Sequence, residues 1–449
     1  MANVTHQPDP VEGQRVYELD RAHVFQSWAA QAMLNPIAVA SAHGCFLWDY
    51  DGKRYFDFAS EFVFTNIGHQ HPRVIEAIVK QANELCTVVP PHAIAARSDA
   101  AALITDLMPD THNKVFFTNG GADANENAIR MARIFTGRDK VLSAYRSYHG
   151  NTGGAIVATG DQRRWPNEYA TGHVHFSGPF MYRSPFWSDS LEQESQRALE
   201  HLEEVIRHEG PQTIAAILLE TVVGGAGVIE PPPGYLQGVR ALCDKYGIIY
   251  IADEVMCGFG RTGKWFAFEH YGVLPDLVTF AKGVNSGYVP MGGIIIRNDI
   301  AAIFDNSYFP GGLTYSGHPL ACASAIANIE VIRDEGVLEN ASEVGERVLG
   351  PGLRQLMDRH VSVGDVRGIG MFWALELVKD RETKEPFAPH HSSSPQMSAV
   401  TKAARDRGLL MYVVSNRLHV CPPCNTTADE IREALAILDQ VLTVADEVL

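Results

Sequence analysis

Short apolar runs alternate with longer amphipathic segments through the middle of the chain. The runs are continuously apolar and rich in β-branched residues, which is typical of strands buried on both faces of a parallel sheet. Between two of them, Leu236, Val239 and Cys243 recur at helical spacing, and Gly247 predicts the end of that helix. The predicted strands are residues 114–117, 140–144, 214–220, 248–253, 277–282 and 292–296. This alternation predicts an α/β domain with right-handed crossovers.

The two ends of the chain have a different pattern. Residues 46–58, FLWDYDGKRYFDF, contain two β-prone runs around Asp51-Gly52 and predict a hairpin. Residues 427–449 predict an amphipathic helix, in which Thr427 and Glu430 have the spacing of a capping box. We therefore expect a large central α/β domain, residues 66–324, and a smaller domain formed together by residues 1–65 and 325–449.

Composition and charge narrow the classes of function. The chain has 449 residues, 46% of them hydrophobic, so it is globular in composition and longer than one hydrophobic core usually supports. Lys and Arg number 37 against 53 Asp and Glu, which gives a formal net charge of −16. This acidic balance argues against nucleic-acid binding, because that affinity comes from Lys and Arg displacing counterions from phosphates.

The sequence contains no pattern typical of secretion or of membrane insertion. The N-terminal residues MANVTHQPDPVEGQ are polar and lack the basic-then-apolar order of a signal peptide. No stretch reaches the roughly 20 uninterrupted apolar residues that a membrane span needs. Seven cysteines in so long a chain do not look like a disulfide framework. These observations predict a cytoplasmic globular protein, most simply an enzyme.

Chemically useful residues follow five of the predicted strands. In open α/β sheets, ligands bind beyond the carboxyl ends of the strands, so these residues are expected to meet at one rim. In chain order they are the turn Gly120-Gly121-Ala122, the pair Tyr148-His149, Glu220, Asp253 and Lys282. Each residue alone is weak evidence, and their convergence predicts an active site.

The glycine turn and the lysine each allow two interpretations. A glycine turn that opens a helix offers free backbone N–H groups to a phosphate, and the alternative is a plain tight turn. Lys282 is either a desolvated, nucleophilic amine or a lysine that extends into solvent. Asp253, at the end of the preceding strand, favours the nucleophile, because a carboxylate opposite a Schiff-base lysine is what a pyridinium cofactor requires.

Six segments carry a stronger signal together than any one of them alone. They are TNGGADANENAIRMAR, SYHGNT, AILLETVVGGAGVIEPPPGYL, IADEVMCGFGRTGKWFAFE, TFAKGVNSGYVPMGG and GGLTYSGHPLACASA. In order and spacing they resemble the class III (ω-) aminotransferases, from about residue 40 to about residue 425. The resemblance implies a fold-type-I α/β architecture with a mostly parallel seven-stranded sheet, a smaller α+β domain, and dependence on pyridoxal 5′-phosphate (PLP).

The resemblance also implies roles for individual residues. The catalytic set would be Lys282 as the Schiff-base lysine, Asp253 as the partner of the pyridine nitrogen, and Glu220 near Asp253 and the ring oxygen. The other expected cofactor ligands are Val255 and Tyr148 on the two ring faces, His149 in support, Gly120, Gly121 and Ala122 at the phosphate, and Thr314 reaching the partner subunit's phosphate. The active site would therefore belong to a homodimer, with a tetramer as the alternative.

Departures from the family's pattern concern the substrate. Val63, with Phe62 beside it, stands where many ω-amine members carry Trp, so we expect a reshaped substrate pocket. Tyr412 occupies the position of a mobile arginine that binds the acceptor carboxylate in several members. Arg417 lies five residues later, and an odd offset along a strand reverses the face. Arg417 is therefore a candidate carboxylate or sulfonate ligand, with a surface arginine as the alternative.

Three further patterns favour ordinary structure over a cofactor or a metal. Residues 258–263 match G-x-G-x-x-G, but Asp253 and Glu254 intervene and no helix is expected after the glycines, so nicotinamide binding is disfavoured. Cys421 and Cys424 have zinc or redox spacing without a second pair. The two His-x-His pairs, at 69–71 and 173–175, lack a neighbouring carboxylate or cysteine cluster, so no metal site is expected.

The sequence thus predicts a PLP-dependent aminotransferase with a ping-pong mechanism. The expected donor is an ω-amino acid or amine such as β-alanine, taurine or γ-aminobutyrate, and the acceptor is a 2-keto acid. Pyruvate is the first choice of acceptor because the usual arginine position is altered, and 2-oxoglutarate is next. The alternatives are another PLP enzyme of the same fold, namely a decarboxylase, aminomutase or racemase, and a nicotinamide-dependent dehydrogenase.

Overall fold

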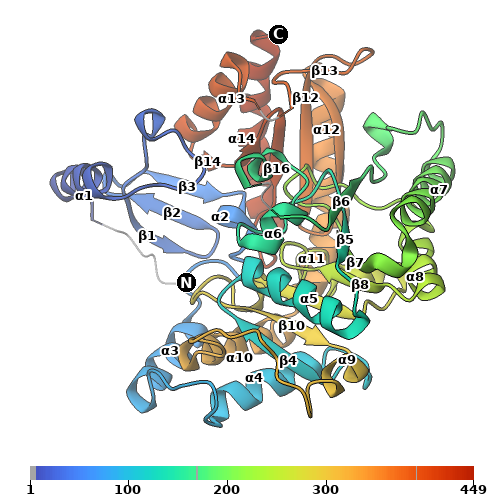
Figure 1. Ribbon diagram of the computed structural model, residues 1–449. Coiled ribbons are helices and arrows are strands. Elements are labelled where there is room, and N and C mark those ends of the chain that lie inside the picture. Colours follow the sequence, from blue (N-terminus) through green and yellow to red (C-terminus); the bar gives the residue numbers. More distant parts are fainter. Residues whose placement is uncertain (1–6, 168–169, 391) are drawn as a thin grey trace.

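The computed structural model describes residues 7–167, 170–390 and 392–449. A seven-stranded sheet forms the centre of its larger part (Figure 1). The strand order is β4-β10-β9-β8-β7-β5-β6, and every neighbouring pair is parallel except those of β10, which is antiparallel to both neighbours. The strands are β4 Lys114–Thr118, β5 Lys140–Ala144, β6 His173–Phe176, β7 Ile214–Glu220, β8 Ile249–Asp253, β9 Leu277–Ala281 and β10 Gly292–Ile296. The predicted α/β fold with a mostly parallel sheet is confirmed.

Alternate residues of the central strands face two separate cores, which explains why the runs are continuously apolar. In β7, Ala216 and Leu218 pack with helix α5 on one face, whereas Ile217 and Leu219 pack into the larger core on the other. The six predicted strands are confirmed to within one residue at each end. The additional strand, β6, lies at the edge of the sheet, where three of its four residues are only partly buried. Its sequence, HVHF, therefore lacks the apolar run that revealed the others.

The helices begin and end with the signals that the sequence contains. Gly247 ends α8 in the left-handed conformation, with φ at +61°, and its N–H donates to the carbonyl of Cys243. Thr427 and Glu430 form the predicted capping box at the start of α14. The helices are α1 Pro10–His23, α2 Ser60–Val63, α3 Pro72–Glu84, α4 Ala95–Thr105, α5 Gly121–Thr136, α6 Gly153–Ala158, α7 Leu191–Glu209, α8 Tyr235–Tyr246, α9 Asn298–Ala302, α10 Pro319–Asp334, α11 Val337–Val344, α12 Gly350–Arg359, α13 Pro395–Asp406 and α14 Ala428–Glu447.

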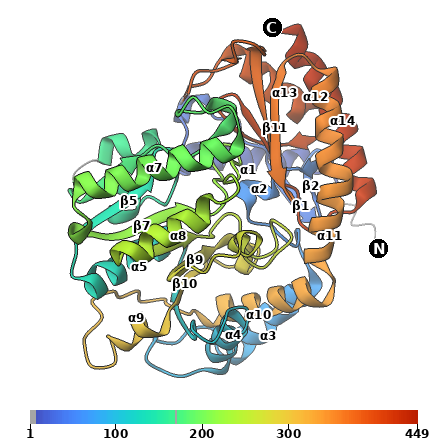
Figure 2. The same ribbon diagram turned by 90° about the vertical axis from the view of Figure 1, so that its right-hand side faces the viewer.

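The N-terminal and C-terminal parts of the chain lie side by side (Figure 2) and form two smaller sheets, the first from both ends and the second from the C-terminal part alone. The orders are β1-β2-β3-β14 and β11-β12-β16-β15, and β13 pairs with β12. The hairpin predicted around Asp51-Gly52 is confirmed as β2 and β3, and β14 pairs in parallel with β3. The strands are β1 Val39–His43, β2 Phe46–Asp49, β3 Arg54–Asp57, β11 Val363–Ile369, β12 Phe372–Asp380, β13 Glu385–Pro386, β14 Leu409–Leu410, β15 Tyr412–Val414 and β16 Arg417–Val420. The domain boundaries at residues 65 and 324 stay a prediction.

The described residues also give information on the state of the cysteines and on membrane-spanning helices. All seven cysteines are free thiols, and all but Cys86 are buried. None of the helices in the described residues combines the length and the apolar character needed to cross a bilayer. The first six residues of the N-terminal stretch compared with a signal peptide lie outside the described part of the chain. The cytoplasmic location stays a prediction.

Candidate active site

The carboxyl ends of five strands of the central sheet open into one cavity of about 180 Å³. Glu220 and Asp253 end the neighbouring strands β7 and β8 and lie opposite each other in register. The sequence-predicted residues that line the cavity are Gly121, Ala122, Tyr148, His149, Glu220, Asp253, Val255 and Lys282. The structure therefore brings the residues that follow β4, β5, β7, β8 and β9 together at one rim.

Asp253 is held in place by three hydrogen bonds and is 3% exposed. Its Oδ2 accepts from Asn125 Nδ2 at 2.7 Å and from His149 Nδ1 at 2.8 Å, and its Oδ1 accepts from the N–H of Val255 at 3.0 Å. Asn125 is itself fixed, because its Oδ1 accepts from Thr279 Oγ1 at 2.7 Å. A carboxylate oriented this firmly is suited to hold one proton on a ring nitrogen.

Asn125 and Thr279 were missed by the sequence reasoning, although a signal for Asn125 exists. Asn125 lies one helical turn after Gly121, so it faces the same rim as the predicted phosphate turn. Thr279 lies two residues before the end of β9 and has no such marker. His149, predicted as a supporting residue, donates to Asp253, and its Nε2 is buried without a partner among the described residues.

Glu220 positions the backbone around the cavity. Its Oε1 accepts from the N–H of Tyr148 at 2.9 Å, and its Oε2 accepts from the N–H of Gly224 at 2.7 Å. Burial raises the pKa of the Glu220 carboxyl group, and the neighbouring Asp253 carboxylate raises it as well. Glu220 therefore fixes Tyr148 at the mouth of the cavity, and its predicted place beside a ring oxygen stays a prediction.

Lys282 presents a free amine to the cavity. It follows β9 with φ at +48°, a left-handed conformation that is uncommon outside glycine. Its Nζ makes no hydrogen bond to the described residues. Burial lowers the pKa of Lys282, and the carboxylates of Asp253 and Glu220 act in the opposite direction. The arrangement yields a neutral, nucleophilic amine below the pH at which an ordinary lysine loses its proton.

The start of α5 forms a cradle for an anion. Gly120 precedes the helix, and no side chain caps this N-terminus. A Cβ at Gly121 would lie 2.8 Å from Val255 Cγ1, and a Cβ at Gly150 would lie 2.5 Å from the Cβ of Ala122. The free N–H groups of the first turn and the dipole of the 16-residue helix favour a phosphate here. The cradle, Asp253 and the amine of Lys282 together fit PLP.

Thr314 lies apart from this cavity. It is exposed in the loop between α9 and α10 and does not line the cavity of its own chain. Its neighbour Ser316 fixes the loop, because Ser316 Oγ donates to the carbonyl of Phe117 at 2.7 Å. The predicted role of Thr314 at a partner subunit's phosphate stays a prediction.

Aromatic residues and one arginine form the other end of the cavity. Trp28, Phe62, Arg163 and Tyr412 line it together with Tyr148. Phe62 contacts Trp28 and Tyr412 edge-on, at ring-centroid distances of 5.6 and 5.5 Å. The Arg163 guanidinium lies 3.6 Å from the centroid of the Tyr148 ring and is paired with Asp161. Sequence reasoning missed Trp28 and Arg163, because both come from irregular segments without a motif.

Phe62 rather than Val63 reaches the cavity. Val63 is 1% exposed and packs in a core cluster, whereas Phe62 is 50% exposed and lines the cavity. Ser60, Glu61 and Val63 all have positive φ, so this short turn is strained. Of the two predicted substrate-binding positions, Phe62 lines the cavity and Val63 is buried away from it, because the strained turn directs the two side chains in different directions.

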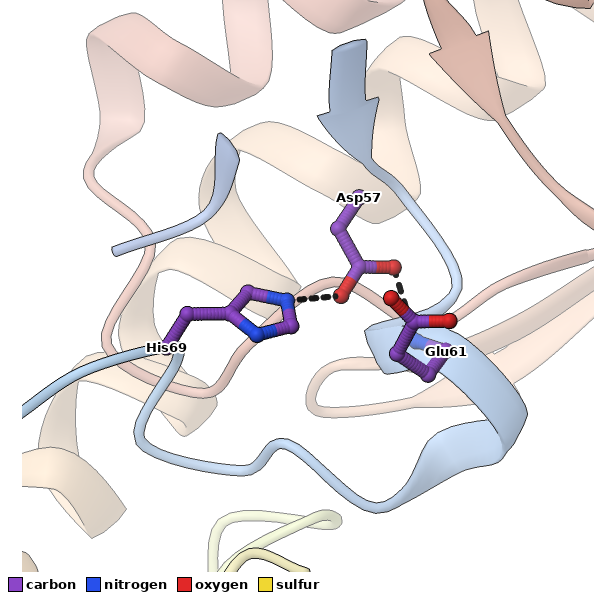
Figure 3. A group of neighbouring side chains, drawn as sticks. All are labelled: Asp57, Glu61 and His69. Atoms are coloured by element: carbon purple, nitrogen blue, oxygen red, sulfur yellow. Dashed lines mark hydrogen bonds and ion pairs between the residues drawn. The ribbon is translucent and has the colours of Figure 1, made fainter. Parts of the chain in front are cut away.

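Asp57 holds the strained turn in place (Figure 3). It accepts from the N–H of Glu61 at 2.7 Å, from Thr65 Oγ1 at 3.2 Å and from His69 Nε2 at 2.9 Å. The ligand atoms of Asp57, Glu61 and His69 lie within 4.8 Å of one another, so His69 does have carboxylate neighbours, contrary to the prediction. Because both Asp57 oxygens already accept hydrogen bonds, the group is explained by its support of the turn.

Arg417 lies on the same face as Tyr412, so the face argument made from the sequence is wrong. The chain reverses at residues 415–416, and the β15–β16 register pairs Val414 with Arg417 and Tyr412 with His419. Residues opposite each other in antiparallel strands share a face, as do residues two apart. Arg417 is also 4% exposed, which excludes the alternative of a surface arginine.

The glycine-rich segment 258–263 has a structural role. No helix opens there, and Arg261, which is fully buried, donates to the carbonyl of Met371 at 3.1 Å and to Asn66 Oδ1 at 2.7 Å. It also bonds Ser60 and the carbonyl of Pro422, so it ties the strained turn to the C-terminal sheet. This placement does not support the dinucleotide-binding alternative.

Comparison with known proteins agrees with this geometry. The profile of the family "Aminotransferase class-III" matches residues 27–442. The taurine–pyruvate aminotransferase of Bilophila wadsworthia is 35% identical over 96% of this chain and 97% of its own length. The putrescine–pyruvate aminotransferase of Pseudomonas aeruginosa is 34% identical over 90% of each.

Solved structures have the same fold over the whole chain. A taurine:2-oxoglutarate aminotransferase from Bifidobacterium kashiwanohense, in complex with PLP and glutamate, superposes with a TM-score of 0.94 at 44% identity, covering 97% of this chain and 98% of its own. An (S)-enantioselective ω-transaminase from Thermomicrobium roseum gives a TM-score of 0.91 at 34% identity, covering 98% and 99%. The family match, the identities and the cavity lead to one conclusion: this chain is a member of the class III aminotransferases, whose cofactor is PLP.

Proposed function

We propose that this aminotransferase takes its amino group from an ω-amino acid whose far end is anionic, such as taurine or β-alanine, and passes it to a 2-keto acid. The observation that carries the proposal is the Arg163 guanidinium in the cavity wall, 3.6 Å from the Tyr148 ring. It lies among Trp28, Phe62 and Tyr412 in the lining of the cavity. Arg163 pairs with Asp161 through Nε and Nη2, and the remaining N–H groups of a guanidinium can bind a carboxylate or sulfonate that enters the cavity.

The residues of the rim would divide the chemistry among them. PLP, when bound, supplies a ring that accepts the electron pair released at the donor carbon. Lys282 would hold the cofactor, and its free amine would move the proton that leaves the donor carbon. Asp253 would hold a proton on the ring nitrogen, and Glu220 holds the Tyr148 backbone in place. Arg163 orients the donor, so that its amine rather than its anion faces Lys282.

The names of the relatives support an ω-amine donor, taurine among them, and leave the acceptor open. Two of the similar proteins are named for taurine, with pyruvate in one name and 2-oxoglutarate in the other, and a third is named for putrescine. Pyruvate remains the acceptor expected from the sequence. A homodimer, with a tetramer as the alternative, and the contribution of Thr314 to a partner subunit are likewise proposals that rest on the resemblance alone.

The experiment is a panel of donors given to the PLP-loaded enzyme without any acceptor. Loss of the visible absorbance of the bound cofactor reports the first half-reaction directly. Taurine and β-alanine are expected to react faster than putrescine, and faster than an aliphatic amine of the same length that has no anionic group at its far end. Faster reaction of putrescine would contradict an anionic donor, and carbon dioxide release without an acceptor would indicate a decarboxylase instead.

A further inference from the structure

A buried histidine, His419 of β16, supports the aromatic end of the active-site cavity. It is 0% exposed and lies opposite Tyr412 of β15 in the register of the hairpin. The two rings pack together, with their centroids 4.7 Å apart and their planes at 39°. Tyr412 lines the cavity and contacts Phe62 edge-on. His419 therefore lies directly behind the part of the wall where the donor is expected, which we call the substrate end.

The same imidazole ring contacts the loop after β7. Its Nε2 lies 3.1 Å from the carbonyl oxygen of Gly224. The N–H of Gly224 donates to Glu220 Oε2 at 2.7 Å, and the other oxygen of Glu220 accepts from the N–H of Tyr148. A Cβ at Gly224 would overlap Met256 Sδ, so the backbone packs directly against a residue of the cavity wall. Gly224 therefore belongs to the end of the cavity that fits PLP, which we call the cofactor end.

His419 has one N–H for two carbonyl groups. Its Nδ1 lies 3.1 Å from the carbonyl oxygen of Tyr412, and its Nε2 faces Gly224 at the same distance. Burial and then the guanidinium of Arg417 lower the pKa of His419 to about 3, although the two carbonyl groups act in the opposite direction. The ring is therefore neutral at physiological pH, and a neutral imidazole donates through only one nitrogen. It donates to Tyr412 or to Gly224, but not to both at once.

The surroundings of Gly224 allow the ring either choice. The Gly224 carbonyl also accepts from the N–H of Gly227 at 2.9 Å and from the N–H of Val228 at 3.1 Å. It therefore keeps hydrogen-bond partners when His419 donates to Tyr412 instead. In either tautomer the nitrogen without a proton faces a carbonyl oxygen, so one of the two contacts is always without a hydrogen bond.

We propose that His419 is a positioning residue that couples the two ends of the cavity through this shared N–H. A donation to Tyr412 holds the substrate end, and a donation to Gly224 holds the loop that fixes Glu220 at the cofactor end. Because one proton serves both bonds, a firmer hold at one end loosens the other, and the coupling is reciprocal. The inference goes beyond the proposed donor class, because it holds whichever amine reacts.

Two substitutions of His419 separate the two bonds. The amide nitrogen of Asn lies near the place of Nδ1 and that of Gln near the place of Nε2, so H419N keeps a donor toward Tyr412 and H419Q keeps one toward Gly224. H419Q is expected to raise the KM of the donor about three- to tenfold, the loss typical of one buried hydrogen bond, and to leave the dissociation constant of PLP unchanged. H419N is expected to show the reverse, and H419F, which keeps a ring and loses both bonds, should raise both constants.

The two constants are measured independently. The KM is obtained with taurine, or with putrescine if taurine does not react. The dissociation constant of PLP comes from titration of the cofactor-free protein, which needs no turnover. The matched control is H112Q, because His112 is also buried and its Nε2 faces the carbonyl of Pro275, but it does not line the active-site cavity. H112Q should change neither constant, even where it lowers the melting temperature.

The pattern across the variants decides the inference. Melting curves show which of them are folded. Equal changes of both constants in H419N and H419Q would mean that His419 only fills space, and would overturn the inference, as would constants like those of the wild type in H419F. Failure of the whole donor panel would overturn the proposed function alone, because the PLP titration still tests the bond to Gly224.

Discussion

The two ends of the active-site cavity are built in different ways. The cofactor end consists of residues at the carboxyl ends of neighbouring strands, and its carboxylates are hydrogen-bonded on both oxygens, as in Asp253 and Glu220. The substrate end contains Tyr412 of β15 together with Trp28, Phe62 and Arg163, which come from three short, irregular or strained segments. Its contacts are ring edges and one guanidinium over a ring.

This difference explains how one scaffold serves several donors. A residue at a strand end is fixed by the register of the whole sheet, so its position cannot change without disturbing the core. A residue on a loop can be exchanged at little cost in stability. The names of relatives, which cover taurine and putrescine, are consistent with a substrate end that varies while the cofactor end stays the same.

The largest expected effect comes from the cofactor end. K282A should lower the turnover of every donor by about 10⁴-fold or more, because both the cofactor attachment and the proton transfer are lost. Steady-state turnover with taurine and with an uncharged amine measures this loss. K402A, which changes an exposed lysine of α13, is the control. Retention of turnover with either donor would show that Lys282 is not the reacting amine.

A smaller and selective effect is expected at the substrate end. R163Q should raise the KM for taurine by roughly 10- to 100-fold, the loss typical of a hydrogen bond to a charged group, and should change the KM for an uncharged amine far less. Initial rates over a range of donor concentrations separate KM from kcat. R164Q removes the neighbouring charge, which does not line the active-site cavity, and serves as the control. An equal rise for both donors would contradict a role in anion recognition.

The smallest expected effect concerns the pKa of the Lys282 amine at the cofactor end and its dependence on the Glu220 carboxylate. Burial lowers the pKa of Lys282, so in the cofactor-free protein its amine should be acetylated with a midpoint below the ordinary lysine value of about 10.4. The Glu220 carboxylate favours the charged amine, so E220Q should move the midpoint further down. Competitive labelling with acetic anhydride, followed by mass spectrometry of the Lys282 peptide, gives the midpoint. An upward shift in E220Q would show that the carboxylate does not act on the amine.

The sequence predicted most residues of the cofactor end and fewer of those at the substrate end. Asp253 and Lys282 end buried strands, and continuous apolar runs reveal such strands because both faces pack against cores. The direction of β10 was not readable, because an antiparallel central strand is as apolar as a parallel one. Arg163 gave no signal, because it lies in a short irregular helix whose place over Tyr148 depends on tertiary packing.

Arg417 shows most clearly where pattern reasoning failed. An odd offset reverses the face only along one uninterrupted strand, whereas here a two-residue turn reverses the chain and returns Arg417 to the face of Tyr412. The adjacent Ser415 and Asn416 have the polar character of a turn, so the signal was present. For Val63, by contrast, the sequence contains no signal, because the positive φ values at three of the four residues 60–63 are not visible in it.

The pairing of β3 with β14 has a consequence for how the protein is made. Lys53 donates to the carbonyls of Arg405 and Asp406, the nearer of which lies 352 residues further along the chain. At the usual 5–20 residues per second, the N-terminal strands wait roughly 20 to 70 seconds for this partner to be synthesised. During that time the edge of β3 is an open template for other chains. The substrate end of the cavity, which needs residues from both chain ends, therefore forms only late in synthesis.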